Sequence, residues 1–283
     1  MSDTNANVTL LGATEVRKLA ELLDVTPTKK LGQNFVIDAN TVRKIVKVAK
    51  VEAGDTVVEI GPGLGSLTLG LLEAGAGVVA VEIDGRLATQ LPVTISEHAA
   101  GTSLTVIHED AMKVMVLPDA PTRLVANLPY NISVPVLLHF MEHFGSIRSG
   151  VVMVQAEVGH RLAAAPGSKV YGGPSVKAAW YGAWRIAGTV SRQVFWPVPN
   201  VDSVLVGFER FDEEPGNDAL RLRTFELVDA AFGQRRKMLR QALSTLCGTS
   251  AAAVELLEAA GIDPTLRGEQ LSVADFVSMA RHS

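Results

Sequence analysis

The hydrophobic and polar positions of the chain divide it into three parts. From residue 56 onward, short apolar runs alternate with segments whose apolar residues recur at helical spacing. The runs predict strands at 56–60, 78–82, 104–108, 124–126 and 150–154. The segments between them predict helices at 66–74, 85–99 and 134–144. This alternation favours right-handed crossovers and a parallel sheet with helices on both faces, which is an α/β fold.

The two ends of the chain carry other patterns. Residues 1–27 form a polar extension with one amphipathic stretch, and a further helix is expected near 39–50. Strands are also predicted at 183–191 and 203–208. Beyond an acidic linker at 212–218, the helical period returns over 220–246, 251–260 and 273–281. We therefore expect an extension at 1–27, an α/β domain at 28–211 and a small all-helical domain at 212–283.

Composition narrows the class of protein. The chain of 283 residues is 47% hydrophobic and 20% charged, as in an ordinary globular protein. A net charge of −4 argues against a polycation that coats nucleic acid, although a local basic face is compatible with it. The single cysteine, Cys247, excludes an internal disulfide and a cysteine-based metal cluster. No apolar run approaches a membrane span and no signal-peptide core is present, so we expect a cytoplasmic protein without membrane association.

Three consecutive predicted strands end in residues suited to a nucleoside. Gly61-x-Gly63-x-Gly65 follows the first strand, and Pro62 within it lacks the N–H that a phosphate loop needs. Glu82 ends the second strand, where it could accept from two ribose hydroxyls. Asp110 follows the third strand, where it could accept from an adenine amine. Each acid alone could be a solvated strand end. The series favours a nucleoside cofactor without phosphates, and a sulfonium nucleoside of this kind is S-adenosylmethionine.

The fourth strand leads into Asn127-Leu128-Pro129-Tyr130. Proline cannot continue a strand ladder, yet its carbonyl and that of Leu128 remain acceptors. A carboxamide oxygen, free carbonyls and an aromatic ring suit a planar heterocycle with an exocyclic amine. A plain strand-ending turn is the alternative interpretation of these four residues when they are taken alone.

These segments, with others along the chain, resemble the ribosomal RNA adenine dimethylase family of Rossmann-like class I methyltransferases. The resemblance runs from about Lys29 to Ala242. Its motifs are Leu31-Gly32-Gln33-Asn34-Phe35, Glu59-Ile60-Gly61-Pro62-Gly63-Leu64-Gly65, Val81-Glu82-Ile83-Asp84, Asp110-Ala111, Asn127-Leu128-Pro129-Tyr130-Asn131-Ile132-Ser133, Ser168-Lys169-Val170-Tyr171-Gly172, Phe195-x-Pro197-x-Pro199-x-Val201-Asp202-Ser203 and Gln234-Arg235-Arg236-Lys237.

The resemblance implies a cofactor, a substrate and a reaction. S-adenosylmethionine would contact Asn34, Val36, Gly61, Glu82, Asp110 and Asn127. The reaction would transfer two methyl groups to N6 of each of two adjacent adenosines near the 3′ end of 16S rRNA in the 30S subunit. The protein would act in biogenesis of the small subunit, as a monomer.

A catalytic role follows for five residues of this family pattern. Asn127 Oδ1 and the carbonyl of Leu128 or Pro129 would accept hydrogen bonds from the adenine amine and make its nitrogen more reactive. Tyr130 would stack on one face of the flipped base and Phe195 would cover the other. Stacking of this kind contributes roughly 1–3 kcal/mol per base.

A basic cluster beyond the linker is the candidate RNA-binding face. It comprises Arg235, Arg236, Lys237 and Arg240, with Lys29 and Lys30 near the N-terminal motif. A solvated helix face is the alternative interpretation. No metal site is expected, because the histidines show no ligand spacing beyond the pair His139 and His143. Two other functions stay open at this point: a 23S rRNA adenine-N6 methylase, and a non-catalytic ribosome assembly factor on the same fold.

Overall fold

The computed structural model describes residues 8–25, 34–129 and 132–283. Its contacts divide the chain into two compact units. The first unit contains residues 1–159 and 185–209, and the second contains residues 160–184 and 210–283. The chain thus enters the second unit twice, whereas its sequence pattern predicts one boundary after residue 211. Residues 160–184 join the C-terminal helices because their helix is packed against them.

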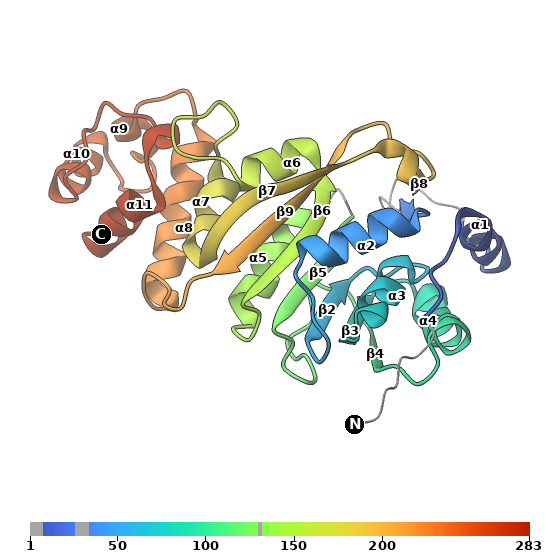
Figure 1. The fold of residues 1–283 in the computed structure, drawn as a ribbon. Helices are drawn as coiled ribbons and strands as arrows, with labels where there is room; N and C mark the ends of the chain where they lie inside the picture. The colour runs from blue at the N-terminus through green and yellow to red at the C-terminus, as the bar shows by residue number, and fades with distance from the viewer. Residues whose placement is uncertain (1–7, 26–33, 130–131) are drawn as a thin grey trace. The chain divides into compact units, whose positions relative to one another are not determined.

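A mixed sheet forms the centre of the first unit, in the strand order β4-β3-β2-β5-β6-β9-β7 (Figure 1). The first five of these strands pair in parallel, and β9 pairs antiparallel with β6. Their bounds are β2 Thr56–Ile60, β3 Gly77–Glu82, β4 Leu104–His108, β5 Arg123–Asn127, β6 Ser149–Gln155, β7 Gly182–Val190 and β9 Ser203–Arg210. The five predicted parallel strands are present, each within one residue of its expected bounds, and the α/β fold class is confirmed.

Helices cover the two faces of this sheet according to the direction of each crossover. They are α2 (Ala39–Val48), α3 (Ser66–Glu73), α4 (Gly85–His98) and α5 (Ser133–His143). The chain moves from β2 towards β4 through α3 and α4, and then from β5 towards β6 through α5. Right-handed crossovers in opposite directions place α3 and α4 on one face and α5 on the other. Helix α2 shares the face of α3, since Ile45 and Leu69 lie in one buried cluster.

The N-terminal extension contributes helix α1 (Ala13–Leu22) to the same cluster. Val16 and Ala20 are buried, as the predicted amphipathic pattern requires. Thr9 donates its backbone N–H to the carbonyl of His98 at 2.9 Å, which fixes the start of the segment to the end of α4. Arg86 donates to the Asp24 carbonyl at 2.8 Å and fixes its end. The extension is therefore part of the packed first unit.

A second, two-stranded sheet was not predicted from the sequence. Strand β1 (Phe35–Val36) pairs antiparallel with β8 (Phe195–Trp196), which follows the 3₁₀ turn η1 (Arg192–Val194). The Ile37 amide donates to the Val194 carbonyl at 2.8 Å and extends this pairing. Two residues are too few to show a period of two, so the pairing has no sequence signature. It joins segments 160 residues apart and fixes the position of Asn34 and Val36.

The second unit is helical, with its own buried core. Leu227, Leu239, Leu257 and Phe276 are fully buried in that core. Its elements are α7 (Gly173–Tyr181), α8 (Asp218–Gly233), α9 (Leu239–Ala242), α10 (Ser250–Ala259), η2 (Gly268–Gln270) and α11 (Val273–Arg281), and α6 (Ala156–Leu162) leads into it. Helices α6 and α7 were not predicted, whereas α10 and α11 lie where the helical period places them.

The prediction of one helix over 220–246 was wrong. Helix α8 ends at Gly233, and a turn closed by the Lys237 amide and the Gln234 carbonyl separates it from α9. The amide of Leu239 then donates to the carbonyl of Leu266 at 2.7 Å, so a tertiary contact replaces a helical one. Apolar residues still recur at helical spacing across the break, because α8 and α9 both pack against the same core. The basic cluster therefore lies mainly on a turn.

Gly150 provides a test of the sheet. A Cβ atom there would lie 2.1 Å from the carbonyl oxygen of Leu124 on β5 and 2.6 Å from the ring of Phe208 on β9. We expect Gly150→Ala to lower the free energy of unfolding by about 3 kcal/mol or more, because overpacked cores typically lose 1–3 kcal/mol and backbone cannot move aside. Gly145→Ala is the control, since nothing lies within 4 Å of its added Cβ. Urea unfolding measures both, and equal stability of the two variants would contradict this packing.

Candidate active site

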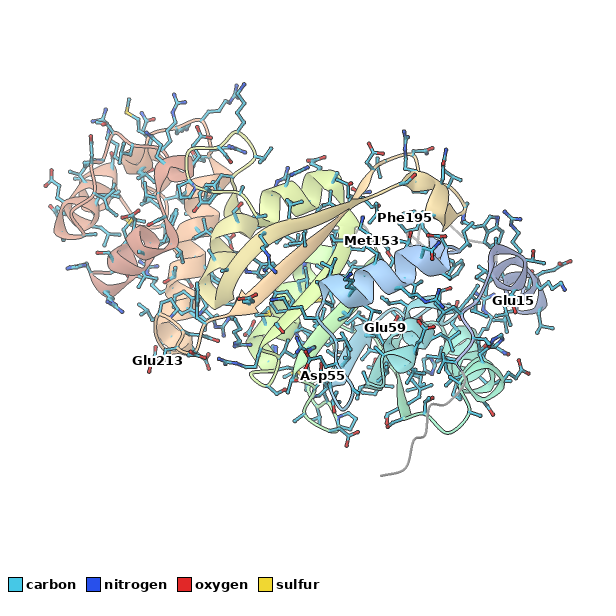
Figure 2. The ribbon with its side chains drawn as sticks, in the orientation of Figure 1. Glu15, Asp55, Glu59, Met153, Phe195 and Glu213 are labelled. Atoms are coloured by element: carbon cyan, nitrogen blue, oxygen red, sulfur yellow. The ribbon has the colours of Figure 1, made fainter. Side chains whose placement is uncertain are left out.

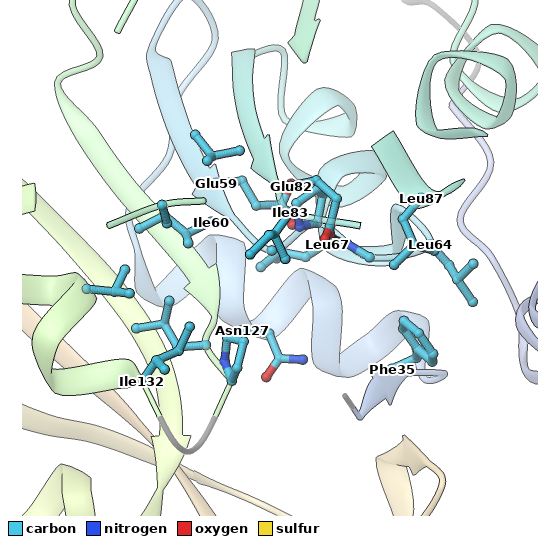
Figure 3. Close-up of a pocket in the computed structure, with 18 of the residues that line it drawn as sticks. Phe35, Glu59, Ile60, Leu64, Leu67, Glu82, Ile83, Leu87, Asn127 and Ile132 are labelled. Carbon is cyan, nitrogen blue, oxygen red and sulfur yellow. Dashed lines mark hydrogen bonds between the residues drawn. The ribbon is translucent and has the colours of Figure 1, made fainter. Parts of the chain in front are cut away.

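A pocket of about 310 Å³ lies at the carboxyl ends of the parallel strands in the first unit (Figure 3). Strand β1 and the segments that follow β2, β3, β4 and β5 line it. This is where open α/β sheets bind ligands, because neighbouring loops diverge there. Figure 3 shows Glu82 of β3 and Asn127 of β5 on different sides of the pocket. The strand-end residues predicted from the sequence therefore line one cavity, although they belong to different strands and loops.

The glycine loop after β2 forms a tight wall of this pocket. Gly63 adopts φ +58°, and a Cβ atom there would lie 2.9 Å from the ring of Phe35 on β1. Gly65 adopts φ +95°, and its Cβ would lie 2.8 Å from Leu91 on α4. Glycine is needed at both positions for its backbone freedom and for the close approach of neighbours. The loop can therefore turn sharply from β2 into α3 while remaining in contact with β1.

Glu82, at the end of β3, is held in place by backbone amides. Its Oε2 accepts from Gly63 N–H at 3.1 Å and its Oε1 accepts from Asp84 N–H at 3.0 Å. The side chain is buried, and burial raises the pKa of this carboxyl, while the two amide bonds act in the opposite direction. The carboxylate lines the pocket in a fixed orientation. This geometry suits an acceptor for hydroxyl groups of a ligand.

Asp110 lies at the next strand end, beyond β4. Its Oδ1 accepts from the Met112 amide at 3.0 Å, which orients the carboxylate. Ile83 and Met112 line the same pocket and are 57% and 39% exposed. Apolar side chains can pack against a flat ring, and a fixed carboxylate beside them can accept a hydrogen bond from a polar edge of that ring. The adenine role of Asp110 stays a prediction.

Asn127 ends β5 and faces the pocket with a fixed carboxamide. Its Nδ2 donates to the Asn34 carbonyl at 2.9 Å, so Oδ1 is left as the acceptor on the pocket side. The Leu128 amide donates to the Met153 carbonyl at 3.1 Å and the Pro129 carbonyl accepts from Ile132 N–H at 3.3 Å. The backbone of this corner is therefore fixed by β6 and by the start of α5. The Pro129 carbonyl is already bonded to Ile132, which makes the Leu128 carbonyl the better second acceptor.

Glu59 lines the pocket and was not singled out from the sequence as a site residue. It is 1% exposed on β2, and Thr68 Oγ1 of α3 donates to its Oε2 at 2.6 Å. Burial raises the pKa of this carboxyl to about 8, with a smaller contribution from the charge of Glu82 and an opposing one from the Thr68 bond. The available signal in the sequence was a glutamate within an apolar strand. Glutamate is rarely fully buried without a partner, so its presence there indicates a special role.

Most of the residues predicted to bind the cofactor or substrate line this one pocket. They are Asn34, Val36, Gly61, Glu82, Asp110, Asn127, Leu128 and Pro129. Tyr130 lies outside the described residues, as do Lys29 and Lys30. Phe195 is not among the pocket residues. Phe195, labelled in Figure 2, is 1% exposed and belongs to the buried core. Its partner across the β1–β8 pair is Val36.

The predicted RNA-binding residues of the second unit differ in their surroundings. Arg235 donates from Nε to Glu269 at 3.0 Å and from its guanidinium to the Lys169 carbonyl at 2.7 Å. It therefore connects two loops of the unit. Arg236 and Lys237 are exposed on the turn after α8. Arg240 is half-buried on α9, close enough to Asp263 to lower the pKa of that carboxyl, although the Thr265 hydrogen bonds have the larger effect.

Two observations on the described residues concern membrane spans and metal sites. In residues 8–25, 34–129 and 132–283, no helix is long and apolar enough to cross a membrane. The same ranges contain no group of three or more His, Cys, Asp or Glu side chains that could hold a metal ion. The sheet order, the glycine loop and the pocket at the strand ends together define a Rossmann-like class I methyltransferase fold.

Comparison with known proteins identifies the family. The family model described as "Ribosomal RNA adenine dimethylase" matches residues 26–282. The chain is 71% identical to "Ribosomal RNA small subunit methyltransferase A" of Leifsonia xyli subsp. xyli over 96% of this chain and 98% of that protein. It is 57% identical to the protein of the same name in Corynebacterium diphtheriae, over 99% and 97%. The chain belongs to the ribosomal RNA adenine dimethylase family.

Solved structures share the fold. A dimethyladenosine transferase from Plasmodium falciparum matches with a TM-score of 0.74 and 25% identity, over 87% of this chain and 95% of that one. The 23S rRNA methyltransferase ErmE matches with a TM-score of 0.65 and 24% identity, over 88% and 99%. At that identity the second likeness concerns the fold alone.

The buried Glu59 predicts a pH dependence of stability. Its pKa is about 8 in the folded protein against 4.5 as the ordinary value, so between these pH values the folded protein holds a proton that the unfolded chain has released. The free energy of unfolding therefore falls as pH rises through this window, by up to about 1.4 kcal/mol per pH unit. Glu59→Gln should flatten this fall and stabilise the protein above pH 8.

Urea unfolding at several pH values between about 5 and 9 measures the effect. Glu97→Gln, an exposed substitution of the same kind on α4, is the control and should keep the slope of the parent protein. Glu82 also has a raised pKa, so some slope should persist in Glu59→Gln. An unchanged slope in that variant would show that Glu59 is ionised in the folded protein.

Proposed function

We propose that this protein transfers methyl groups from S-adenosylmethionine to N6 of two adjacent adenosines near the 3′ end of 16S rRNA in the 30S subunit. It would dimethylate each adenosine and act in biogenesis of the small subunit. Membership of the adenine dimethylase family and the names of relatives at 71% and 57% identity support this. The proposal rests on one structural observation above all: Glu82, Asp110 and Asn127 line the same pocket.

The charges of the pocket support a sulfonium nucleoside as the cofactor. Four acids line it: Glu59, Glu82, Glu109 and Asp110. Among the described residues that line it there is no lysine, arginine or histidine. Such a site repels phosphates and attracts a cation. When bound there, S-adenosylmethionine supplies an activated methyl group on a positively charged sulfur.

Two acids suit the nucleoside part of this cofactor. Glu82, fixed by two amides, would accept from the ribose hydroxyls. Asp110 would accept from the adenine amine, with Ile83 and Met112 against the ring. Asn34 and Val36 of the β1 segment and Gly61 of the loop complete the wall that the family resemblance predicts.

The Asn127 corner would hold the target base. Asn127 Oδ1 and the Leu128 carbonyl would each accept a hydrogen bond from the N6 amine of the adenine. Acceptance by two oxygens favours a pyramidal nitrogen whose lone pair is less delocalised, and it fixes that nitrogen for transfer. Pro129 supports the corner, since its carbonyl accepts from Ile132. No residue of the chain needs to form a covalent bond in this scheme.

The stacking roles of Tyr130 and Phe195 remain predictions. Phe195 is buried on β8, which pairs with β1, so it would have to leave the core to cover a flipped base. RNA binding by the second unit is proposed for Arg236 and Lys237 in the first place, since both are exposed. Arg235 would contribute mainly by holding the loops at Lys169 and Glu269.

The two alternative functions are less well supported. A 23S rRNA methylase is favoured only by the fold shared with ErmE. A non-catalytic assembly factor would not need the fixed Asn127 carboxamide or the acid-lined pocket. Both relatives compared above are named as small-subunit methyltransferases.

Asn127→Ala tests the catalytic role. Loss of one acceptor aimed at developing charge should cost about 3 kcal/mol in the barrier, so turnover should fall about a hundredfold or more. The assay is transfer of labelled methyl from S-adenosylmethionine to unmethylated 30S subunits, followed by mapping of the modified nucleotides. Cofactor affinity, measured by calorimetry on the same variant, separates catalysis from binding.

The control is Asn40→Ala, at an exposed position in the first turn of α2, which should methylate normally. Near-normal methylation by Asn127→Ala would refute the role of the carboxamide. Label in 23S rRNA in place of 16S rRNA would favour the alternative substrate.

Charge reversal tests the RNA face. Arg236→Glu combined with Lys237→Glu should weaken binding to 30S subunits severalfold or more and reduce its salt dependence, because fewer counterions are released from the RNA. Cofactor affinity should not change. The adjacent exposed pair Arg17 and Lys18 on α1, reversed in the same way, is the control of equal charge. Equal loss of binding in both double variants would indicate a general charge effect, without a defined face.

A further inference from the structure

His139 of α5 is half-buried, and the proposed mechanism gives it no role. Its Nε2 lies 2.8 Å from the carbonyl oxygen of Val114, in the segment that follows β4. A carbonyl oxygen can only accept, so the imidazole carries a hydrogen on Nε2 and donates it. The bond joins residues 25 positions apart, from two segments that both reach the pocket.

Neighbouring rings hold the imidazole of His139 in this orientation. It meets the ring of Phe144 nearly edge-on, at 84° with 6.4 Å between the centroids, and the ring of His143 lies 4.3 Å away. His143 donates from Nδ1 to the carbonyl of His139 at 2.9 Å. His143 therefore bonds within its own helix, whereas His139 bonds to another segment of the first unit.

The segment after β4 carries part of the pocket wall. Asp110 and Met112 line the pocket. The Met112 amide donates to Asp110 Oδ1 at 3.0 Å and the Lys113 amide donates to the Asp110 carbonyl at 2.8 Å, so these bonds close the turn on itself. Val114 is buried, but apolar burial is non-directional. The bond from His139 is directional, and it fixes where this turn lies along α5.

Helix α5 is itself close to the proposed chemistry. Val136 in its first turn lines the pocket, as does Ile132, which directly precedes the helix. Val136 and His139 are three positions apart, so they are neighbours on the surface of the helix. The bond to Val114 therefore connects the turn that carries Asp110 with the helix that begins beyond the Asn127 corner.

We propose that His139 is a positioning residue that places the Asp110 carboxylate for recognition of a purine by its 6-amino group. This inference rests on the proposed function, since it takes Asp110 as the acceptor for the adenine amine. His139 is not among the pocket residues and acts through the carbonyl of Val114. A carboxylate rejects a 6-oxo purine because two acceptors then face each other, and that rejection requires the carboxylate to be held in place.

Two probes that differ at the purine edge test the inference. S-adenosylhomocysteine carries the 6-amino group, whereas S-inosylhomocysteine carries a 6-oxo group there. The parent protein should bind the first probe about tenfold more tightly or better. His139→Leu should reduce this preference roughly threefold to tenfold, through weaker binding of the adenosine probe, because the bond that fixes the turn is lost.

Titration calorimetry on the full-length protein measures both affinities, and urea unfolding shows whether each variant is folded. His139→Gln retains an N–H donor at about the reach of Nε2 and should restore the parental preference. His143→Leu removes the histidine that bonds within α5 and should also keep that preference. If His139→Leu does not fold, His139→Asn takes its place, since its shorter side chain does not reach Val114.

The outcomes separate this inference from the proposed function. Equal weakening of both probes by His139→Leu, or an unchanged preference, overturns the inference while the function stands. A parent protein that binds both probes alike overturns the inference together with the adenine role of Asp110. A parent protein that binds neither probe shows that the proposed cofactor is wrong, and the inference falls with it.

Discussion

A single backbone-to-carboxylate contact connects the parts of this site, the 3.1 Å hydrogen bond from Gly63 N–H to Glu82 Oε2. It joins the loop after β2 to the end of β3, and it is possible only because Gly63 adopts φ +58° with no Cβ against Phe35. Phe35 in turn belongs to β1, whose neighbour Asn34 accepts from Asn127 at 2.9 Å. A substitution at Gly63 would therefore disturb the nucleoside wall and the Asn127 corner together.

The second constraint is charge. The pocket encloses several acids, and burial raises the pKa of both Glu59 and Glu82. Burial makes the ionised form of these groups costly in the ligand-free protein, since carboxylates lose hydration when buried. A cationic ligand compensates for that loss. The same acids that reduce stability thus favour a sulfonium nucleoside over the phosphate-bearing cofactors that many related sheets bind.

Much of the fold was predictable because the parallel strands are short apolar runs, and three of them lead into Gly61, Glu82 and Asp110. Glu82, Asp110 and Asn127 could be placed in one site from the sequence, since strand ends of a parallel sheet share an edge. Other features depend on distant contacts. The break between α8 and α9 follows from the bond of Leu239 to Leu266, and the β1–β8 pair joins segments with no common pattern. The pairing that buries Phe195 beside Val36 has no signal in the sequence either.

The most direct measurement is a crystal structure of the protein with S-adenosylhomocysteine. The account predicts ribose hydroxyls within hydrogen-bond distance of Glu82, the adenine amine at Asp110, and the sulfur facing the Asn127 corner. A nucleoside bound elsewhere, or bound in this pocket with Glu82 and Asp110 turned away from it, would contradict the account.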